Sequence, residues 1–197
     1  TVGSLLKKRS FGRETSLGVI LVFTVGVTGF INPRFVTGDG TRDLLSATAI
    51  VALLAIGIAP IMIMRHIDLS IASTVGLSAW LVADSCAKNP SFTWLQCFLI
   101  GGLVGVCVGV INGLLVAGLR LPSLVVTLGT LYIVRGGVYV VSNSVDYNAQ
   151  EMPPSLLSLG QKVFFGLLPF PFLLALLLMA TVAWIMKYTK PGRDCYA

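Results

Sequence analysis

The chain has 197 residues, of which 55% are hydrophobic and 11% are charged, and its formal net charge is +6. An ordinary soluble domain carries about 25% charged residues, so a water-soluble fold could not hide this much apolar surface. The basic excess does not indicate a nucleic-acid partner, because the lysines and arginines are spread among loops and no groove-reading module is visible. We therefore predict an all-α, polytopic protein of the lipid bilayer.

Six apolar runs separated by charged segments predict about six transmembrane helices. Crossing the hydrocarbon core takes roughly 20 helical residues. The predicted spans are 16–31, 44–64, 69–84, 92–118, 123–142 and 163–186. The first and third are short, and the first is interpreted as an uncleaved span because no small-residue cleavage pattern follows it.

The distribution of lysine and arginine predicts a cytoplasmic N-terminus, because positive charge in short loops stays on that side. With six crossings, nine basic residues fall on the cytoplasmic side and four on the opposite side, with Arg135 inside the membrane. The nine are Lys7, Lys8, Arg9, Arg13, Arg65, Arg120, Lys187, Lys190 and Arg193, and the four are Arg34, Arg42, Lys88 and Lys162.

The longest predicted outer loop, residues 142–162, contains Asp146, Glu151 and two consecutive prolines. Loops often carry binding functions, so this one could form a docking surface for a partner. A plain connector with a turn explains the same residues equally well.

The segment between the second and third spans, residues 65–70, lacks Gly, Asn and Pro, which predicts a tight or partly re-entrant hairpin. Asp68 is placed to act as the N-cap of the third span, where a carboxylate accepts backbone N–H bonds and meets the positive end of the helix dipole. The functional alternatives are a gating ion pair with Arg65 or contact with a cytoplasmic partner. His66 could relay protons, but an ordinary interface histidine is the simpler interpretation.

Gly101, Gly105, Gly109 and Gly113 repeat every four residues along the fourth span. Four residues of an α-helix turn through about 400°, so these glycines form a ridge along one face. Such a ridge lets a second helix approach closely and gain dispersion contacts. The pattern predicts tight helix packing and no particular function.

Polar residues within the apolar runs are candidates for a substrate path: Asn112 in the fourth span, and Thr127 and Arg135 in the fifth. A charge at this depth costs a few kcal/mol on insertion scales, so Arg135 is expected to face the bundle interior or an aqueous cavity. Snorkelling to an interface, or a structural bond to helix carbonyls, is the alternative for Arg135.

Catalytic motifs of the types GxxxxGK[ST], HExxH and GxSxG do not occur in the sequence, so we expect no catalytic residue and an energy source elsewhere. No metal site or cofactor is expected, because the cysteines occur singly and there is one histidine. The cysteines, interpreted as packing or incidental thiols, are Cys86, Cys97, Cys107 and Cys195.

Three stretches resemble the permease subunits of bacterial sugar-uptake ABC transporters of the ribose, xylose, rhamnose and autoinducer-2 type. They are IDLS at 67–70, GVINGLLV at 109–116, and LPSLVVTLGTL at 121–131 followed by Arg135-Gly136. Arg65-His66 stands where many members of this family have two glycines. Members of the rhamnose and autoinducer-2 types resemble this chain in having a basic residue there, and NAQEM at 148–152 resembles the rhamnose type.

This resemblance implies a permease subunit of the inner (plasma) membrane that forms a translocation path with a second copy or a homologue. It implies a separate ATPase on the side of residues 187–193 and a separate sugar-binding protein on the side of residues 142–162. Arg65 and Asp68 are then candidates for conformational coupling, while Asn112, Thr127 and Arg135 line or support the path. Members of the family continue into a coupling helix and further spans, so residues 1–197 are expected to form one permease domain that is incomplete.

The leading alternative is a proton-coupled secondary transporter or channel, in which His66, Asp68 and Arg135 would move or sense protons. An intramembrane enzyme is a weaker alternative, because the spans lack a paired acid and base. The resemblance leans toward rhamnose or autoinducer-2 as the solute and leaves the sugar undecided, as it does the choice between homodimer and heterodimer.

Overall fold

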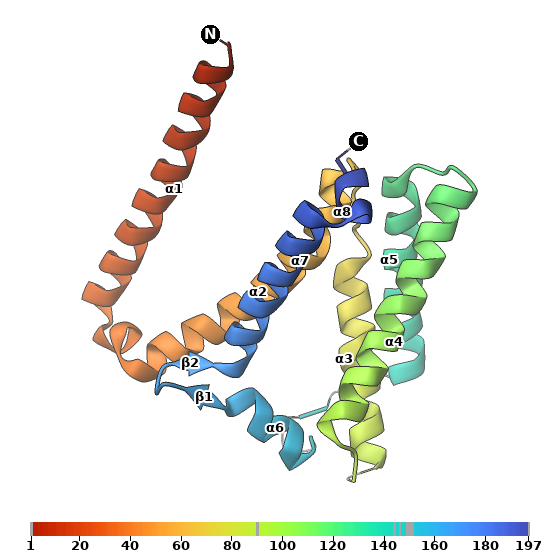
Figure 1. The fold of residues 1–197 in the computed structure, drawn as a ribbon. Coiled ribbons are helices and arrows are strands. Elements are labelled where there is room, and N and C mark those ends of the chain that lie inside the picture. The colour runs from red at the N-terminus through yellow and green to blue at the C-terminus, as the bar shows by residue number, and fades with distance from the viewer. Residues whose placement is uncertain (1, 90, 144, 146, 149–151, 197) are drawn as a thin grey trace.

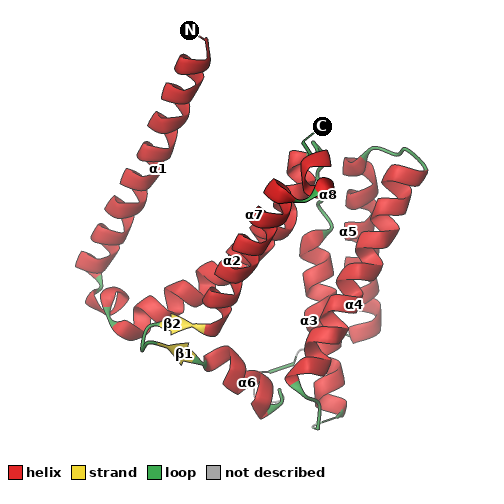
Figure 2. Cartoon of the chain, viewed as in Figure 1, coloured by secondary structure: helices red, strands yellow, loops and turns green. Residues whose placement is uncertain are grey.

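The computed structural model describes residues 2–89, 91–143, 145, 147–148 and 152–196, with side chains from residue 15 onward. Helices form nearly all of the described chain, and the strands form one short hairpin (Figure 2). The elements in chain order are α1 (Val2–Ile31), the 3₁₀ helix η1 (Pro33–Val36), α2 (Gly38–Ile63), α3 (Ile71–Lys88), α4 (Trp94–Gly113), the π-helical segment η2 (Leu114–Gly118), α5 (Ser123–Ser142), α6 (Pro154–Gln161), β1 (Val163–Phe164), β2 (Leu168–Pro169), α7 (Phe170–Tyr188) and α8 (Lys190–Asp194).

Each of the six predicted spans overlaps a helix: α1, α2, α3, α4 with η2, α5 and α7. Among the described residues, four helices are long and apolar enough to cross a membrane, namely α2, α4 continued by η2, α5 and α7. The apolar part of α1, Thr15–Ile31, is shorter. The last turns of α3 carry Asp84 and Lys88, which lowers its hydropathy below that of the four.

The predicted start of the sixth span at residue 163 was wrong, because α7 begins at Phe170. Residues 163–169 form an antiparallel hairpin whose turn residues, Phe165 and Gly166, have φ of 53° and 72°, as in a type I′ turn. Both Nε and Nη2 of Arg42 on α2 donate to Gly166 O, at 3.1 and 2.6 Å. A short apolar run does not distinguish strand from helix, so composition alone placed the helix start too early.

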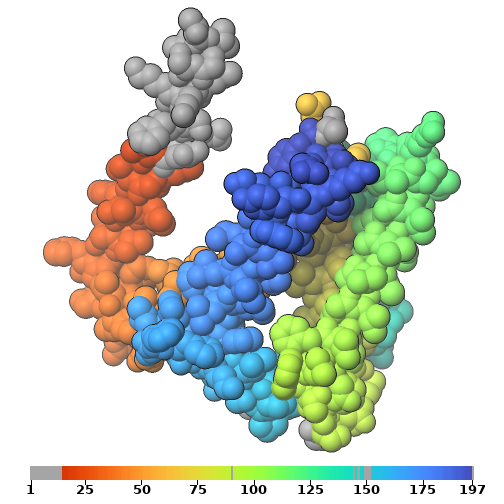
Figure 3. All heavy atoms as spheres, in the orientation of Figure 1, coloured from red at the N-terminus to blue at the C-terminus, as the bar shows by residue number. Residues whose placement is uncertain are grey.

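The helices form two packed groups (Figure 1): α2 lies against α7, and α3 packs on both α4 and α5. Helix α6 contacts α4 and α7 and so links the two groups at one end. Between the groups lies a groove of about 500 Å³, lined by residues of α2, α3 and α4. The space-filling view shows the hollow between α7 and α4 (Figure 3).

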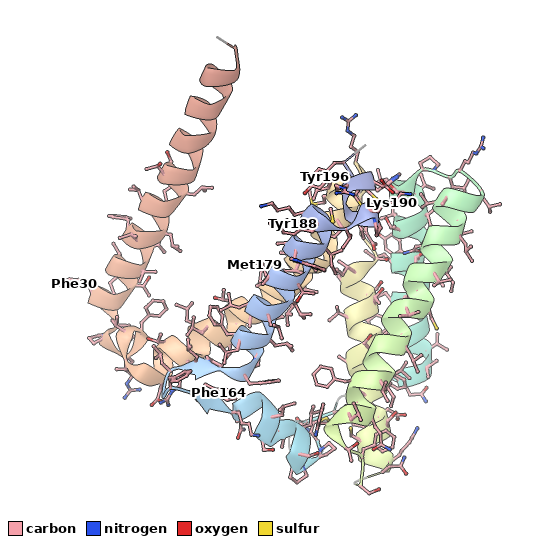
Figure 4. All side chains as sticks on the ribbon, in the orientation of Figure 1. Phe30, Phe164, Met179, Tyr188, Lys190 and Tyr196 are labelled. Atoms are coloured by element: carbon pink, nitrogen blue, oxygen red, sulfur yellow. The ribbon has the colours of Figure 1, made fainter. Side chains whose placement is uncertain are left out.

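Large apolar side chains cover the outside of the molecule (Figure 4), and Phe30, labelled there, is 90% exposed. The few fully buried apolar residues are small or lie at helix contacts, such as Ala49 in α2 and Ala175 in α7. In a bilayer, apolar side chains on the outside of a protein face the lipid chains, and polar groups must find partners inside the protein. The distribution of side chains therefore follows the rule expected for a membrane protein.

Candidate functional site

Helix α2 ends in a Schellman motif, in which Arg65 occupies the position that usually holds glycine. The Arg65 N–H donates to Met62 O at 3.0 Å, and the His66 N–H donates to Ile61 O at 3.1 Å. The φ of Arg65 is 61°, in the left-handed region that costs a residue with a Cβ about 1 kcal/mol. This motif makes the tight connection predicted for residues 65–70 without a glycine.

We expect Arg65→Gly to raise the stability of the detergent-solubilised protein by about 1 kcal/mol, because glycine adopts a positive φ without strain. Thermal unfolding measures the gain. Arg65→Lys is the matched control, since it keeps both the charge and the Cβ and is expected to leave stability unchanged. A stabilised Arg65→Gly variant with normal solute uptake would remove Arg65 from the candidates for conformational coupling.

A chain of hydrogen bonds joins residues 66–70 to α4 and α5. Asp68 Oδ1 accepts from the backbone N–H of Ser70 at 2.8 Å and from Ser70 Oγ at 2.6 Å. Asn112 on α4 donates from Nδ2 to Ser70 Oγ at 2.9 Å, and its Oδ1 accepts from Thr130 Oγ1 on α5 at 2.6 Å. Asp68, Ser70, Asn112 and Thr130 form what we term the Asp68–Thr130 network.

A second set of bonds holds the same segment against the start of α5. Thr127 Oγ1 donates to Ile67 O at 3.2 Å and to Ser123 O at 2.9 Å, and Ser123 Oγ accepts from the Ile67 N–H at 3.3 Å. Thr127 is 3% exposed, so water does not compete for its hydroxyl. Non-helical backbone at membrane depth requires protein partners of this kind. The two sets of bonds therefore explain how residues 66–70 can lie between helices.

The expectation that Asp68 is the N-cap of the third span was wrong, because α3 begins at Ile71 and Ser70 is its N-cap residue. Ser70 makes no side-chain cap bond, since its hydroxyl is engaged by Asp68 and Asn112. Asp68 instead accepts the N–H two residues ahead, as in an Asx-turn. It forms no ion pair with Arg65; the ion pairs of the described chain join Asp39 to Arg42 and Asp84 to Lys88.

The Asp68–Thr130 network borders a cavity of about 260 Å³. The polar side chains that line this cavity are His66, Asp68, Asn112, Ser123 and Thr127, and the remaining lining is apolar or glycine. A mostly apolar pocket with a few converging polar groups is typical of small-molecule sites, whose volumes begin at about 300 Å³. The structure thus brings together Asp68, Asn112 and Thr127, each of which was singled out from the sequence.

Arg135 lies outside this network. It lines a separate cavity of about 300 Å³ between α3 and α5, with Ser73 and Gly76 on one side and Leu131 and Val138 on the other. The Arg135 side chain is exposed and forms no hydrogen bond or ion pair with the described part of the chain. A role in the substrate path therefore stays a prediction for this residue.

The space in front of the glycine ridge of α4, where side chains would begin, is open in the described part of the chain. A Cβ built on Gly101, Gly105, Gly109 or Gly113 would meet no atom within 4 Å. Gly109 and Gly113 instead border the cavity beside Asn112, and Gly101 and Gly105 border the groove facing α2. Tight packing of a second helix on this ridge stays a prediction.

Two members of the network, Ser70 and Thr130, were not singled out from the sequence. Ser70 follows Asp68 by two residues, which is the spacing of an Asx-turn, and could have been found by that pattern. Thr130 lies three residues after Thr127, so both hydroxyls fall on one face of α5. In the predicted outer loop, Asp146 and Glu151 lie outside the described residues.

Comparison with known proteins places these features in a family context. The family model described as "Branched-chain amino acid transport system / permease component" matches residues 40–197. The autoinducer 2 import system permease protein LsrC of Enterobacter sp. (strain 638) is 35% identical over 94% of this chain and 52% of its own length. The LsrC proteins of Klebsiella pneumoniae and Photorhabdus luminescens are 34% and 32% identical over 98% of this chain, and over 54% and 57% of their own lengths. The chain thus spans about half the length of these curated relatives, and no solved structure matches it.

Proposed function

Because this chain belongs to the family of branched-chain amino acid transport system permease components, we propose that it is the permease subunit of an ATP-binding-cassette importer of the bacterial inner membrane. The observation that carries the proposal is the family match over residues 40–197. The relatives are named as autoinducer 2 import permeases, so the solute proposed is autoinducer 2 or a similar small sugar. ATP hydrolysis is assigned to a separate subunit.

We propose six crossings with both ends of the chain in the cytoplasm. The arrangement of the helix ends supports this topology (Figure 1): the end of α2, the α4–α5 connection and α8 lie at one end, and the hairpin, α6 and the α3–α4 connection lie at the other. Arg65, Arg120 and Arg193 belong to the first end, as the positive-inside rule requires. Epitope tags at Lys8 and Lys190 are expected on the cytoplasmic face, and a tag at Asn89 on the outer face.

The ATPase is proposed to dock where α8 meets the end of α2. Arg65 lines a cavity of about 320 Å³ together with Asp194, Cys195 and Tyr196, so α8 lies beside the segment that leads to the Asp68–Thr130 network. Lys190 and Tyr196 are labelled at this end in Figure 4. Movement of α8 would in this way reach residues 66–70. The binding protein is proposed to dock at the opposite end, and a second copy or homologue completes the path.

The energy source tests the proposed function. In cells that express the chain with its ATPase and binding-protein partners, uptake of labelled autoinducer 2 is expected to stop when ATP is depleted and to survive collapse of the proton gradient. The opposite result would favour the proton-coupled secondary transporter. A carrier that works without the binding protein would also contradict the proposal.

Arg135→Ala is expected to reduce this uptake about tenfold, since a hydrogen bond to a charged group contributes about 1.5–3 kcal/mol. The guanidinium lines the cavity between α3 and α5, and its N–H donors make no bond to the described chain, so they are free to bind a polar solute. Arg135→Lys keeps the charge and loses the planar fork, so its uptake is expected to lie between that of the wild type and that of Arg135→Ala. Unchanged uptake by a normally expressed Arg135→Ala protein would take Arg135 out of the path.

A further inference from the structure

Two cysteines that lie eleven residues apart meet in the folded chain. The Sγ atoms of Cys86, at the end of α3, and Cys97, at the start of α4, are 3.4 Å apart. The two residues are 1% and 4% exposed. Cys107 is exposed and Cys195 is half-buried, and neither contacts another thiol of the described chain. The sequence alone had indicated four isolated thiols.

The packing of α3 on α4 holds this pair in place. A second contact between the same helices runs from Ser78 Oγ to Gly101 O at 3.4 Å, one to two turns from the thiols. A disulfide has an S–S distance of about 2.05 Å, so the sulfurs need to approach by about 1.4 Å. Rotation about the side-chain bonds, together with a small shift of the helix ends, brings the two sulfurs this much closer.

We propose that Cys86 and Cys97 become a disulfide as the protein matures. The α3–α4 connection lies at the end of the molecule opposite α8 (Figure 1). Under the topology of the proposed function, on which this step rests, that end faces the oxidising side of the membrane, where disulfides form and persist.

The reaction is thiol–disulfide exchange with the disulfide of a cellular thiol oxidant, before the packing of α3 on α4 buries both thiols. The thiolate of one cysteine attacks a sulfur of the oxidant, which releases one thiol and leaves a mixed disulfide. The second cysteine then attacks the mixed disulfide and releases the other thiol. In total, Cys86 and Cys97 lose two protons and two electrons, and the oxidant's disulfide is reduced to two thiols.

The disulfide would clamp α3 to α4 at the end opposite the Asp68–Thr130 network. Ser70, directly before α3, is bonded to Asn112 near the end of α4. Cys86 and Cys97 join the other ends of the same two helices. With both ends fastened, α3 and α4 would move as one body during transport.

Peptide mapping tests the bond directly, because Lys88 lies between the two cysteines and trypsin cleaves after it. Membranes that carry the protein in a Cys107→Ser, Cys195→Ser background are dissolved in SDS with N-ethylmaleimide, so that denaturation exposes the buried thiols and every free thiol is blocked. We expect the peptides that contain Cys86 and Cys97 to stay joined until a reductant is added, with loss of the blocked-thiol signal from both. Cys86→Ser is the matched control, in which Cys97 should be blocked.

Two blocked thiols in the membrane-derived protein would overturn the proposal. Oxidation of the detergent-solubilised protein with diamide then identifies the step that failed. Linkage by diamide, together with a tag at Asn89 found in the cytoplasm, would place the error in the proposed topology. No linkage by diamide, in solubilised protein whose two thiols both react with N-ethylmaleimide without denaturation, would place the error in the contact between the two thiols.

Discussion

Replacing Asn112 by aspartate is expected to destabilise the α3–α4–α5 group by about 3 kcal/mol and to stop uptake, although it exchanges only an NH₂ group for an oxygen. Asn112 is 7% exposed, and its Nδ2 donates to Ser70 Oγ, whose own hydrogen is directed at Asp68. A carboxylate at residue 112 has no hydrogen for Ser70, so acceptor would face acceptor. It would also bury a second negative charge near Asp68 without a cation to pair with it.

Thermal unfolding in detergent and solute uptake measure this effect. Asn32→Asp is the matched control, because Asn32 is exposed and its Oδ1 accepts from the Arg34 N–H, which an aspartate also does. Asn112→Ala removes the same bonds without adding charge, so its stability and uptake should lie between those of the wild type and Asn112→Asp. Acidic buffer is expected to restore part of the stability of Asn112→Asp, because a protonated carboxyl can donate to Ser70. Wild-type stability of Asn112→Asp at neutral pH would show that the network does not hold α3, α4 and α5 together.

The main helices could be predicted from the sequence because each carries a long apolar run. Each of the six runs overlaps a helix, and four of these helices are long and apolar enough to cross a membrane. The hairpin at residues 163–169 could not, since it has the same apolar composition as the helix that follows. Its turn depends on a left-handed pair of residues and on an arginine more than a hundred positions away. Long-range contacts of this kind leave no local pattern.

The candidate site was predicted as separate residues and not as a unit. Asp68, Asn112 and Thr127 stood out because polar groups in or beside apolar runs need partners. Asp68 reaches Asn112 through Ser70, and Asn112 bonds to Thr130, whereas Thr127 bonds to Ile67 O, 60 residues away. Helical periodicity carries no information about which helices adjoin. Cys86 and Cys97 are a different case. Cys86 lies just after the third predicted span and Cys97 near the start of the fourth, and a hairpin of helices places such positions close together.

Asp68→Ala and Asp68→Asn distinguish a role of Asp68 as the hydrogen-bond acceptor of Ser70 from a role of its negative charge in coupling. Asp68 Oδ1 accepts two hydrogen bonds from Ser70, which is 1% exposed, so water cannot replace the lost acceptor. We expect Asp68→Ala to lower the free energy of unfolding by about 1–3 kcal/mol and to abolish uptake. Asp68→Asn keeps an oxygen at this position and is expected to retain most of both.

Asp68→Asn is expected to have a small effect because the charge of Asp68 has no ion-pair partner in the described chain, whereas its acceptor oxygen has two donors. Asp39→Ala is a matched control at an exposed carboxylate, where loss of the surface ion pair with Arg42 should cost at most about 1 kcal/mol. Unfolding curves and uptake rates are compared for all three variants. If Asp68→Asn is as stable as the wild type and yet as inactive as Asp68→Ala, the negative charge itself takes part in coupling, and hydrogen bonding to Ser70 does not account for the role of Asp68.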